Sequence, residues 1–243
     1  MAHRQRSGAK IYAGLLAMVL TAQPRLAWAQ GVGSPASILE KGQWVMGLGA
    51  MMHPGRTLEG NGKAQVYGGG HYRGYGLTNW LSLYGMLGAA DVKIDDAGIV
   101  KTGDPSSKNS FGVNLMAEAQ VKAKLFERRG WELDASAFYT DIRARHKNKN
   151  EVRWYDWQMA AGVAKSLGRF KPYAGARISL LNARIKVREN GALVTNKSYQ
   201  QDSPFGAYLG TDVYFGEQRD VILNVEGSYI NGPEMDVGVA YIF

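Results

Sequence analysis

Histidines and carboxylates are the side chains from which this sequence could build an enzyme. Three of its four histidines, His53, His71 and His146, lie beyond residue 30. A histidine within reach of a carboxylate can act as a general base, and the available pairs are His53 or His146 with Asp95 and Asp96. Their spacing fits no catalytic motif and does not define the geometry of a nucleophile and a base. We therefore predict no catalytic residues.

The chain contains no cysteine, which excludes a disulfide framework, a zinc–thiolate site and thiol catalysis. No other cluster of ligand-type side chains predicts a metal site or a cofactor.

Charged side chains recur at every second position of several otherwise apolar segments, which would place them on one face of a strand. Because both signs are present, they can pair with one another. The expected inward-facing set comprises Lys63, Gln65, His71, Arg73, Glu118, Lys122, Lys124, Glu132, Asp134, Asp156, Arg177, Asp212 and Glu226. The charge network expected among them consists of eight residues: Glu118, Lys122, Glu132, Asp134, Asp156, Arg177, Asp212 and Glu226.

A second group is strongly basic and belongs to two neighbouring hairpins. Arginine and lysine bind phosphate well, so one hypothesis is a rim that clamps the phosphates of lipopolysaccharide or binds another ligand. The alternative is that these residues serve only as solvated surface charge. The first hairpin also carries His146, Lys149 and Arg153, and the second carries Lys197. The predicted basic rim itself consists of Arg143, Arg145, Lys147, Arg184, Lys186 and Arg188.

The first 29 residues have the order of a secretory signal peptide: a basic start, the apolar run IYAGLLAMVLTA, and small residues at Ala27 and Ala29. The apolar run is too short to span a bilayer as a helix, which takes about 20 residues. We expect cleavage after Ala29, leaving residues 30–243 as one domain. Cleavage would remove four basic residues and lower the net charge from +8 to +4, so a nucleic-acid partner is not expected.

The elements expected to position these residues are strands, because period-two alternation recurs in blocks of about ten residues or more. In residues 111–125, for example, Phe111, Val113 and Leu115 begin an apolar face that continues to Leu125. The predicted strands are 43–52, 62–74, 79–92, 110–125, 131–145, 152–166, 172–188, 203–215, 221–231 and 234–243.

A soluble β-sandwich would also alternate, but these segments are long and carry aromatic residues near both ends. Membrane barrels have strands of about 9–11 residues, apolar outside and polar inside, with aromatic girdles at both interfaces. The fold class is therefore all-β, a single closed antiparallel transmembrane barrel of ten strands. Eight strands is the alternative, if the first segment, WVMGLGAMM, or the region 177–188 is not a membrane strand; in the latter the polar phase changes between Ser179 and Asn182. The aromatic residues are Trp80, Trp131, Phe215 and Tyr241 near one rim, and Phe111, Tyr139, Tyr155 and Tyr229 near the other.

The last ten residues, EMDVGVAYIF, resemble the end of a bacterial outer-membrane β-barrel protein. YGLTNWLSLYGMLGAAD likewise resembles a turn and strand of small OmpA- and OmpW-like barrels. The resemblance implies that Val239, Tyr241 and Phe243 form part of the signal read by the barrel-assembly machinery. It also implies an outer-membrane location with both termini in the periplasm, and outer-membrane lipid and lipopolysaccharide as partners.

The expected role is non-enzymatic: a structural or surface-interaction barrel that contacts the outer leaflet and displays its loops. The interior charges would form an ionic plug, whereas a narrow porin-like channel for small solutes is the alternative. Some barrel enzymes use a histidine with Asp or Ser at the outer rim, but His53 and His146 match no such family motif. The oligomeric state is not predicted.

Overall fold

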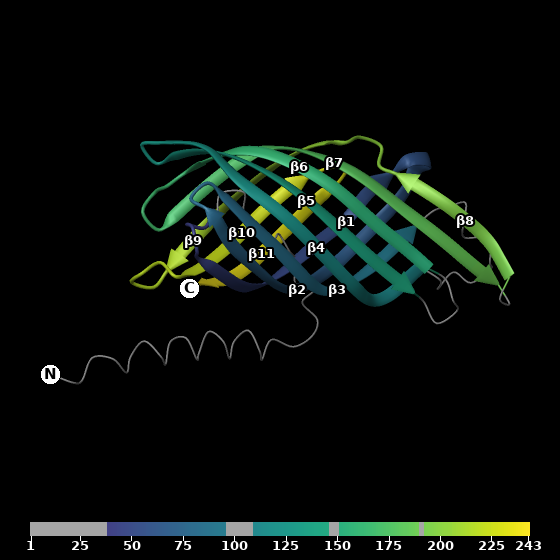
Figure 1. Ribbon diagram of the computed structural model, residues 1–243. Helices are drawn as coiled ribbons and strands as arrows, with labels where there is room; N and C mark the ends of the chain where they lie inside the picture. The colour runs from purple at the N-terminus through teal and green to yellow at the C-terminus, as the bar shows by residue number, and fades with distance from the viewer. Residues whose placement is uncertain (1–37, 96–108, 146–150, 190–191) are drawn as a thin grey trace, which may run out of the picture.

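Long antiparallel strands make up nearly all of the computed structural model, which describes residues 38–95, 109–145, 151–189 and 192–243 (Figure 1). The described helical structure is a single 3-10 turn, η1 (Glu59–Asn61). No helix in these ranges is long and apolar enough to cross a membrane. The strands are β1 (Trp44–Leu58), β2 (Gly62–Thr78), β3 (Leu81–Asp95), β4 (Asn109–Arg128), β5 (Trp131–Arg145), β6 (Glu151–Lys165), β7 (Phe170–Glu189), β8 (Ala192–Gln200), β9 (Phe205–Phe215), β10 (Val221–Tyr229) and β11 (Pro233–Ile242).

Ten of these strands close into a barrel. Neighbouring strands pair in chain order, β7 pairs with β9, and β1 pairs with β11 to complete the circle. The closing register sets Val45 opposite Ile242 and Met52 opposite Met235. The predicted ten-stranded antiparallel barrel is therefore confirmed, and the eight-stranded alternative is wrong.

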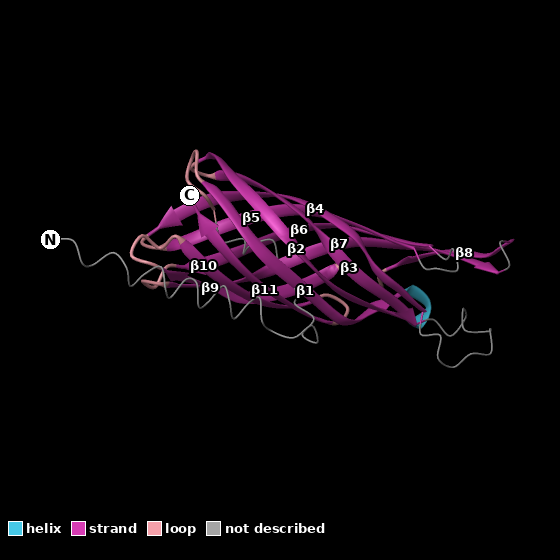
Figure 2. Cartoon of the chain, turned by 90° about the horizontal axis from the view of Figure 1, so that it is seen from below, coloured by secondary structure: helices cyan, strands magenta, loops and turns pink. Residues whose placement is uncertain are grey.

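The eleventh strand, β8, lies in a segment that we expected to be an outer loop. It pairs with the far part of β7, from Asn182 to Glu189, and projects beyond the barrel (Figure 2). Between Ile178 and Asn182, β7 changes partner from β9 to β8. The inward phase of β7 continues through Leu181, Ala183 and Ile185, and β6 stays paired with it to Lys186, so the polar residues change face here because the interior itself becomes apolar.

The two ends of the barrel differ. One end, here the turn end, has the short connections after β2, β4, β6 and β9, and Phe243 lies there (Figure 1). The opposite end is the loop end, where β7 and β8 project. The β4–β5 turn has positive φ at Arg129 (52°) and Gly130 (74°), as a two-residue type I′ hairpin requires.

The polarity of the wall reverses that of a soluble protein over most of its height. Leu87, Trp157, Leu180 and Leu209 are among many large apolar side chains exposed on the outside. The alternate positions of the same strands face inward, and many of these are polar or charged yet buried. An apolar outside and a polar inside suit a wall surrounded by lipid.

A short strap, residues 38–43, crosses the turn end and carries Leu39 into the interior. Leu39 is 2 % exposed, packs in the same cluster as Tyr72 and Tyr84, and donates its N–H to Ser82 Oγ at 3.0 Å. Gly76 pairs with the strap through its backbone, donating to Gln43 O at 3.0 Å. A Cβ atom added to Gly76 would lie 1.9 Å from Glu40 O, so this position requires glycine.

We predict that Gly76→Ala displaces the strap and destabilises the barrel by about 1–3 kcal/mol, the usual cost of overpacking. The matched control is Gly85→Ala, because a Cβ there meets nothing closer than Glu118 O at 3.8 Å. The measurement is the urea midpoint of the refolded proteins in detergent micelles. Equal midpoints for the two variants would show that the strap does not pack as described.

Candidate functional site

Apolar side chains fill the loop half of the interior. Ile94, Ile142 and Ile185 project inward from three strands, and each is at most 1 % exposed. An interior this dry is typical of the core of a soluble protein. The other members of this apolar layer are Leu58, Ala64, Val66, Val92, Met116, Val152, Trp154, Leu181, Ala183 and Tyr199.

A polar layer centred on Arg56 lies directly below the apolar layer. The Arg56 guanidinium donates to Asp156 at 2.8 Å, to Ser179 at 2.6 Å and to Gln201 at 2.7 Å. Glu234 is a further carboxylate, 3.7 Å from Arg56 Nη1. With 1 % of Arg56 exposed, its charge is held by these contacts in place of water.

Arg177 organises the next part of the polar interior. It donates to Glu226 and, at 3.4 Å, to Ser228, and it lies 3.9 Å from Glu234. Its guanidinium also stands 4.8 Å from the centre of the Tyr208 ring. Glu234 thus lies within 4 Å of both buried arginines and couples the two groups.

Toward the turn end, further buried charges contact polar and aromatic partners, although Asp134 Oδ1 has no hydrogen-bond partner among the described residues. Lys122 is fully buried, with its ammonium 4.3 Å from the Tyr84 ring centre. Lys171 bonds Glu132 at 2.7 Å. Asn224 donates to Asp212 at 2.7 Å.

The structure places all eight residues of the expected charge network inside the barrel. Glu118 accepts a hydrogen bond from Thr140 at 3.3 Å, and the other seven are buried. The set is Glu118, Lys122, Glu132, Asp134, Asp156, Arg177, Asp212 and Glu226.

Five other residues expected to face inward do not join this network. Lys124 lies near the turn end, where it pairs with Glu127 at 2.7 Å. In β2 the phase is opposite to the prediction, because Ala64, Val66 and Tyr72 occupy the inner face. The expectation that polar side chains face the interior fails where the interior is itself apolar, as it is along much of this strand. The side chains found on the outside are Lys63, Gln65, His71 and Arg73.

Arg56 is not among the predicted inward-facing residues, because it lies between the first two predicted strands, 43–52 and 62–74. β1 instead continues to Leu58 and has a register shift between His53 and Arg56 that turns Arg56 inward. Proline within a strand commonly marks such a bulge, so Pro54 was the one signal available.

The histidine pairs considered for catalysis are not assembled in the described part of the chain. His53 is buried, with Nδ1 3.8 Å from Glu234. Asp96 and His146 lie outside the described residues, as does the side chain of Asp95. Within the described ranges, no group of three or more His, Asp or Glu side chains is placed to hold a metal ion.

A basic row lies on the outer face of β5, β6 and β7. The strand register sets Arg143 opposite Arg153, and Arg153 opposite Arg184. Arg143 donates to Asp141 at 2.9 Å and Arg153 to the same oxygen at 3.4 Å. Arg184 bonds only the neutral Asn196 among its described contacts, at 3.1 Å.

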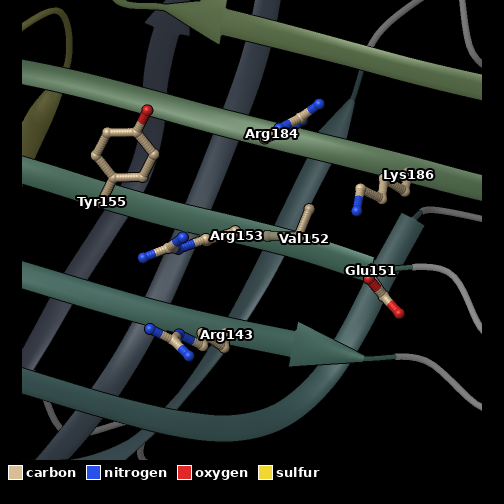
Figure 3. Close-up of a pocket in the computed structure, with 7 residues that line it drawn as sticks. All are labelled: Arg143, Glu151, Val152, Arg153, Tyr155, Arg184 and Lys186. Carbon is tan, nitrogen blue, oxygen red and sulfur yellow. The ribbon is translucent and has the colours of Figure 1, made fainter.

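A hollow of about 450 Å³ lies over this row (Figure 3). Arg184 and Lys186 are the described members of the predicted basic rim on the second hairpin, and Arg143 is the one on the first. Lys147 and the side chains of Arg145 and Arg188 lie outside the described residues. The hollow is lined by Arg143, Glu151, Val152, Arg153, Tyr155, Arg184 and Lys186.

The closed sheet, the apolar outer wall and the charged interior together define a transmembrane β-barrel. No family model and no curated protein matches the sequence.

Several solved barrels are similar in shape. The outer membrane protease OmpT of Escherichia coli matches at 11 % identity and TM-score 0.43, over 86 % of this chain and all of OmpT. Ail, the attachment invasion locus protein of Yersinia pestis, matches at 9 % and 0.42, over 84 % of this chain and 99 % of Ail. An outer membrane channel of Pseudomonas putida matches at 14 % and 0.40, over 91 % of this chain and all of the channel. At these scores we draw nothing about function from the three proteins.

Replacing Arg56 should lower the free energy of unfolding of the barrel more than replacing a surface cation. We expect Arg56→Gln to cost about 3–5 kcal/mol, because Asp156 is left buried without its guanidinium. Lys124→Gln, which breaks the solvent-exposed pair with Glu127, should cost less than about 1 kcal/mol. Urea unfolding in detergent micelles, followed by tryptophan fluorescence, measures both. Similar losses would contradict the central position of Arg56.

Proposed function

We propose that the protein is a non-conducting, non-enzymatic outer-membrane barrel with a structural or surface-interaction role. The observation that carries this proposal is the filling of the interior at successive depths. Apolar side chains occupy the loop half, paired charges the middle, and Leu39 the turn end. A barrel filled in this way acts through its outer surface and its projecting hairpins.

The alternative is a narrow channel for small solutes. A water path needs a continuous polar lining, and a tight apolar constriction excludes water. Ile94, Ile142 and Ile185 stand across any such path at the loop end. This weighs against conduction through the closed barrel.

The proposal includes export and orientation. Residues 1–29 would direct the chain across the inner membrane, and the turn end would face the periplasm. Val239, Tyr241 and Phe243 are exposed on the outer wall, where an assembly factor could contact them. The loop end, with β8 and the basic row, would then face the outside.

Planar-bilayer recording of the refolded protein tests the sealed interior. We expect a folded barrel, identified by its heat-dependent gel mobility, to give no unitary current steps. A general porin inserted in the same bilayer serves as the positive control. Stable, salt-dependent current steps from the folded protein would contradict this proposal and support the channel alternative.

A further inference from the structure

Three guanidinium groups in one row are costly unless something else neutralises them. Directly opposed side chains on neighbouring strands lie about 5 Å apart, and like charges at that spacing repel. Arg143 and Arg153 share the single carboxylate of Asp141, and Arg184 bonds neutral Asn196. The row is therefore positively charged, and the strand register holds the backbones of its three arginines side by side.

The charge around the hollow matches one particular kind of ligand. Among the side chains that the structure describes, four cations and two carboxylates gather here, an excess of two positive charges. A phosphate monoester carries about −1.5 to −2 near neutral pH. The groups counted are Arg143, Arg153, Arg184 and Lys186 against Asp141 and Glu151.

The depth of the row indicates where that phosphate belongs. Outward-facing residues form successive rows across β5, β6 and β7, and the apolar wall begins at the row that contains Trp157. On each strand the arginine lies four residues nearer the loop end than the Trp157 row, about 13 Å along the strand and about 9 Å in height for strands tilted by about 45°. The row itself slants with the tilt, so neighbouring arginines differ in height by about 3 Å. From the loop end inward, the rows are Arg143–Arg153–Arg184, Asp141–Tyr155–Asn182 and Tyr139–Trp157–Leu180.

This height lies just beyond the headgroup layer of a bilayer, which is about 5–8 Å deep in each leaflet, and long arginine side chains can reach back into that layer. Tyr155 and Asn182 occupy the intervening row, and Trp157 packs against Tyr139 with ring centres 4.5 Å apart. Aromatic residues commonly anchor a barrel at this interface. A lipid standing beside Trp157 would thus present its headgroup to the arginines above.

We propose that the row Arg143–Arg153–Arg184 binds the phosphate group of a membrane lipid lying against β5–β7. Arginine suits this role because its planar fork can donate two parallel hydrogen bonds to one phosphate. Arg153, at the centre, contacts the same phosphate as both neighbours. The proposal rests on the proposed function only in requiring a barrel embedded in lipid up to the Trp157 row.

The test compares lipid retention by the refolded full chain in neutral detergent micelles. Native mass spectrometry counts phosphatidic acid and phosphatidylcholine of the same acyl chains, supplied in equal amounts. We expect the wild type to favour phosphatidic acid by at least about tenfold, and the triple variant Arg143→Gln/Arg153→Gln/Arg184→Gln to lose the preference.

The matched control removes three exposed arginines near the turn end, Arg128→Gln/Arg129→Gln/Arg169→Gln. It changes the net charge equally and should keep the preference. Heat-dependent gel mobility verifies folding of each variant. Should the triple row variant fail to fold, Arg153→Gln alone, on an exposed position, must weaken the preference.

Three outcomes would overturn the inference. The wild type could show no preference, or the turn-end variant could lose it equally, which would mean that net charge alone is responsible. Inorganic phosphate could bind the wild type at the row and displace phosphatidic acid completely at low millimolar concentration, which would identify a free anion as the ligand. A conducting barrel that still retains phosphatidic acid through the row would contradict the proposed function and leave this inference intact.

Discussion

Backbone hydrogen bonding without water is the constraint on which the structure depends. In a bilayer every N–H and C=O group of the wall must find a partner within the protein, and a sheet achieves this only by closing. The pairing of β1 with β11 closes the sheet and joins residues from opposite ends of the described chain. Loop closure over such a separation is entropically costly, so the side chains of the wall and the interior must favour the closed state. β8, whose described pairing is with β7 beyond the barrel, is exempt from this requirement because it projects past the wall.

The interior charges follow from the same closure. A polar inner face cannot be hydrated once the barrel is too narrow for water, so each charge needs a partner of its own. Arg56 and Arg177 meet this need by each contacting several acceptors, with Glu234 between them. Such a network specifies one arrangement of strands, because a register slip of a single residue would turn these side chains into lipid.

The sequence predicted the architecture because alternation is a local signal. Ten strands, their approximate limits and the antiparallel closure follow from period-two patterns and short turns. The inward position of residues such as Asp134 and Asp156 follows from the same phase. Arg56 could not be placed, because a bulge near Pro54 changes the phase without changing the composition. β2 was misread because its inner face is apolar from Ala64 to Tyr72, so the expectation of polar residues inside selected the wrong face. β8 was misread because a strand can extend beyond the lipid into a hairpin, and alternation alone does not reveal where the lipid ends. The alignment of Arg143, Arg153 and Arg184 likewise depends on the register between strands. The sequence of a single strand does not determine that register.

Two opposite polarity schemes therefore meet along the same strands. On β5, Leu133 faces outward and Asp134 inward near the turn end, whereas Arg143 faces outward and Ile142 inward near the loop end. The crossover from one scheme to the other occupies about two rows of the wall. A barrel with such a boundary cannot slide along the membrane normal, because a shift toward either side exposes leucine to water or arginine to hydrocarbon. In a thinner or thicker bilayer the lipid has to deform around the wall. The polarity crossover thus fixes the immersion depth of the protein and makes its surroundings adjust to it.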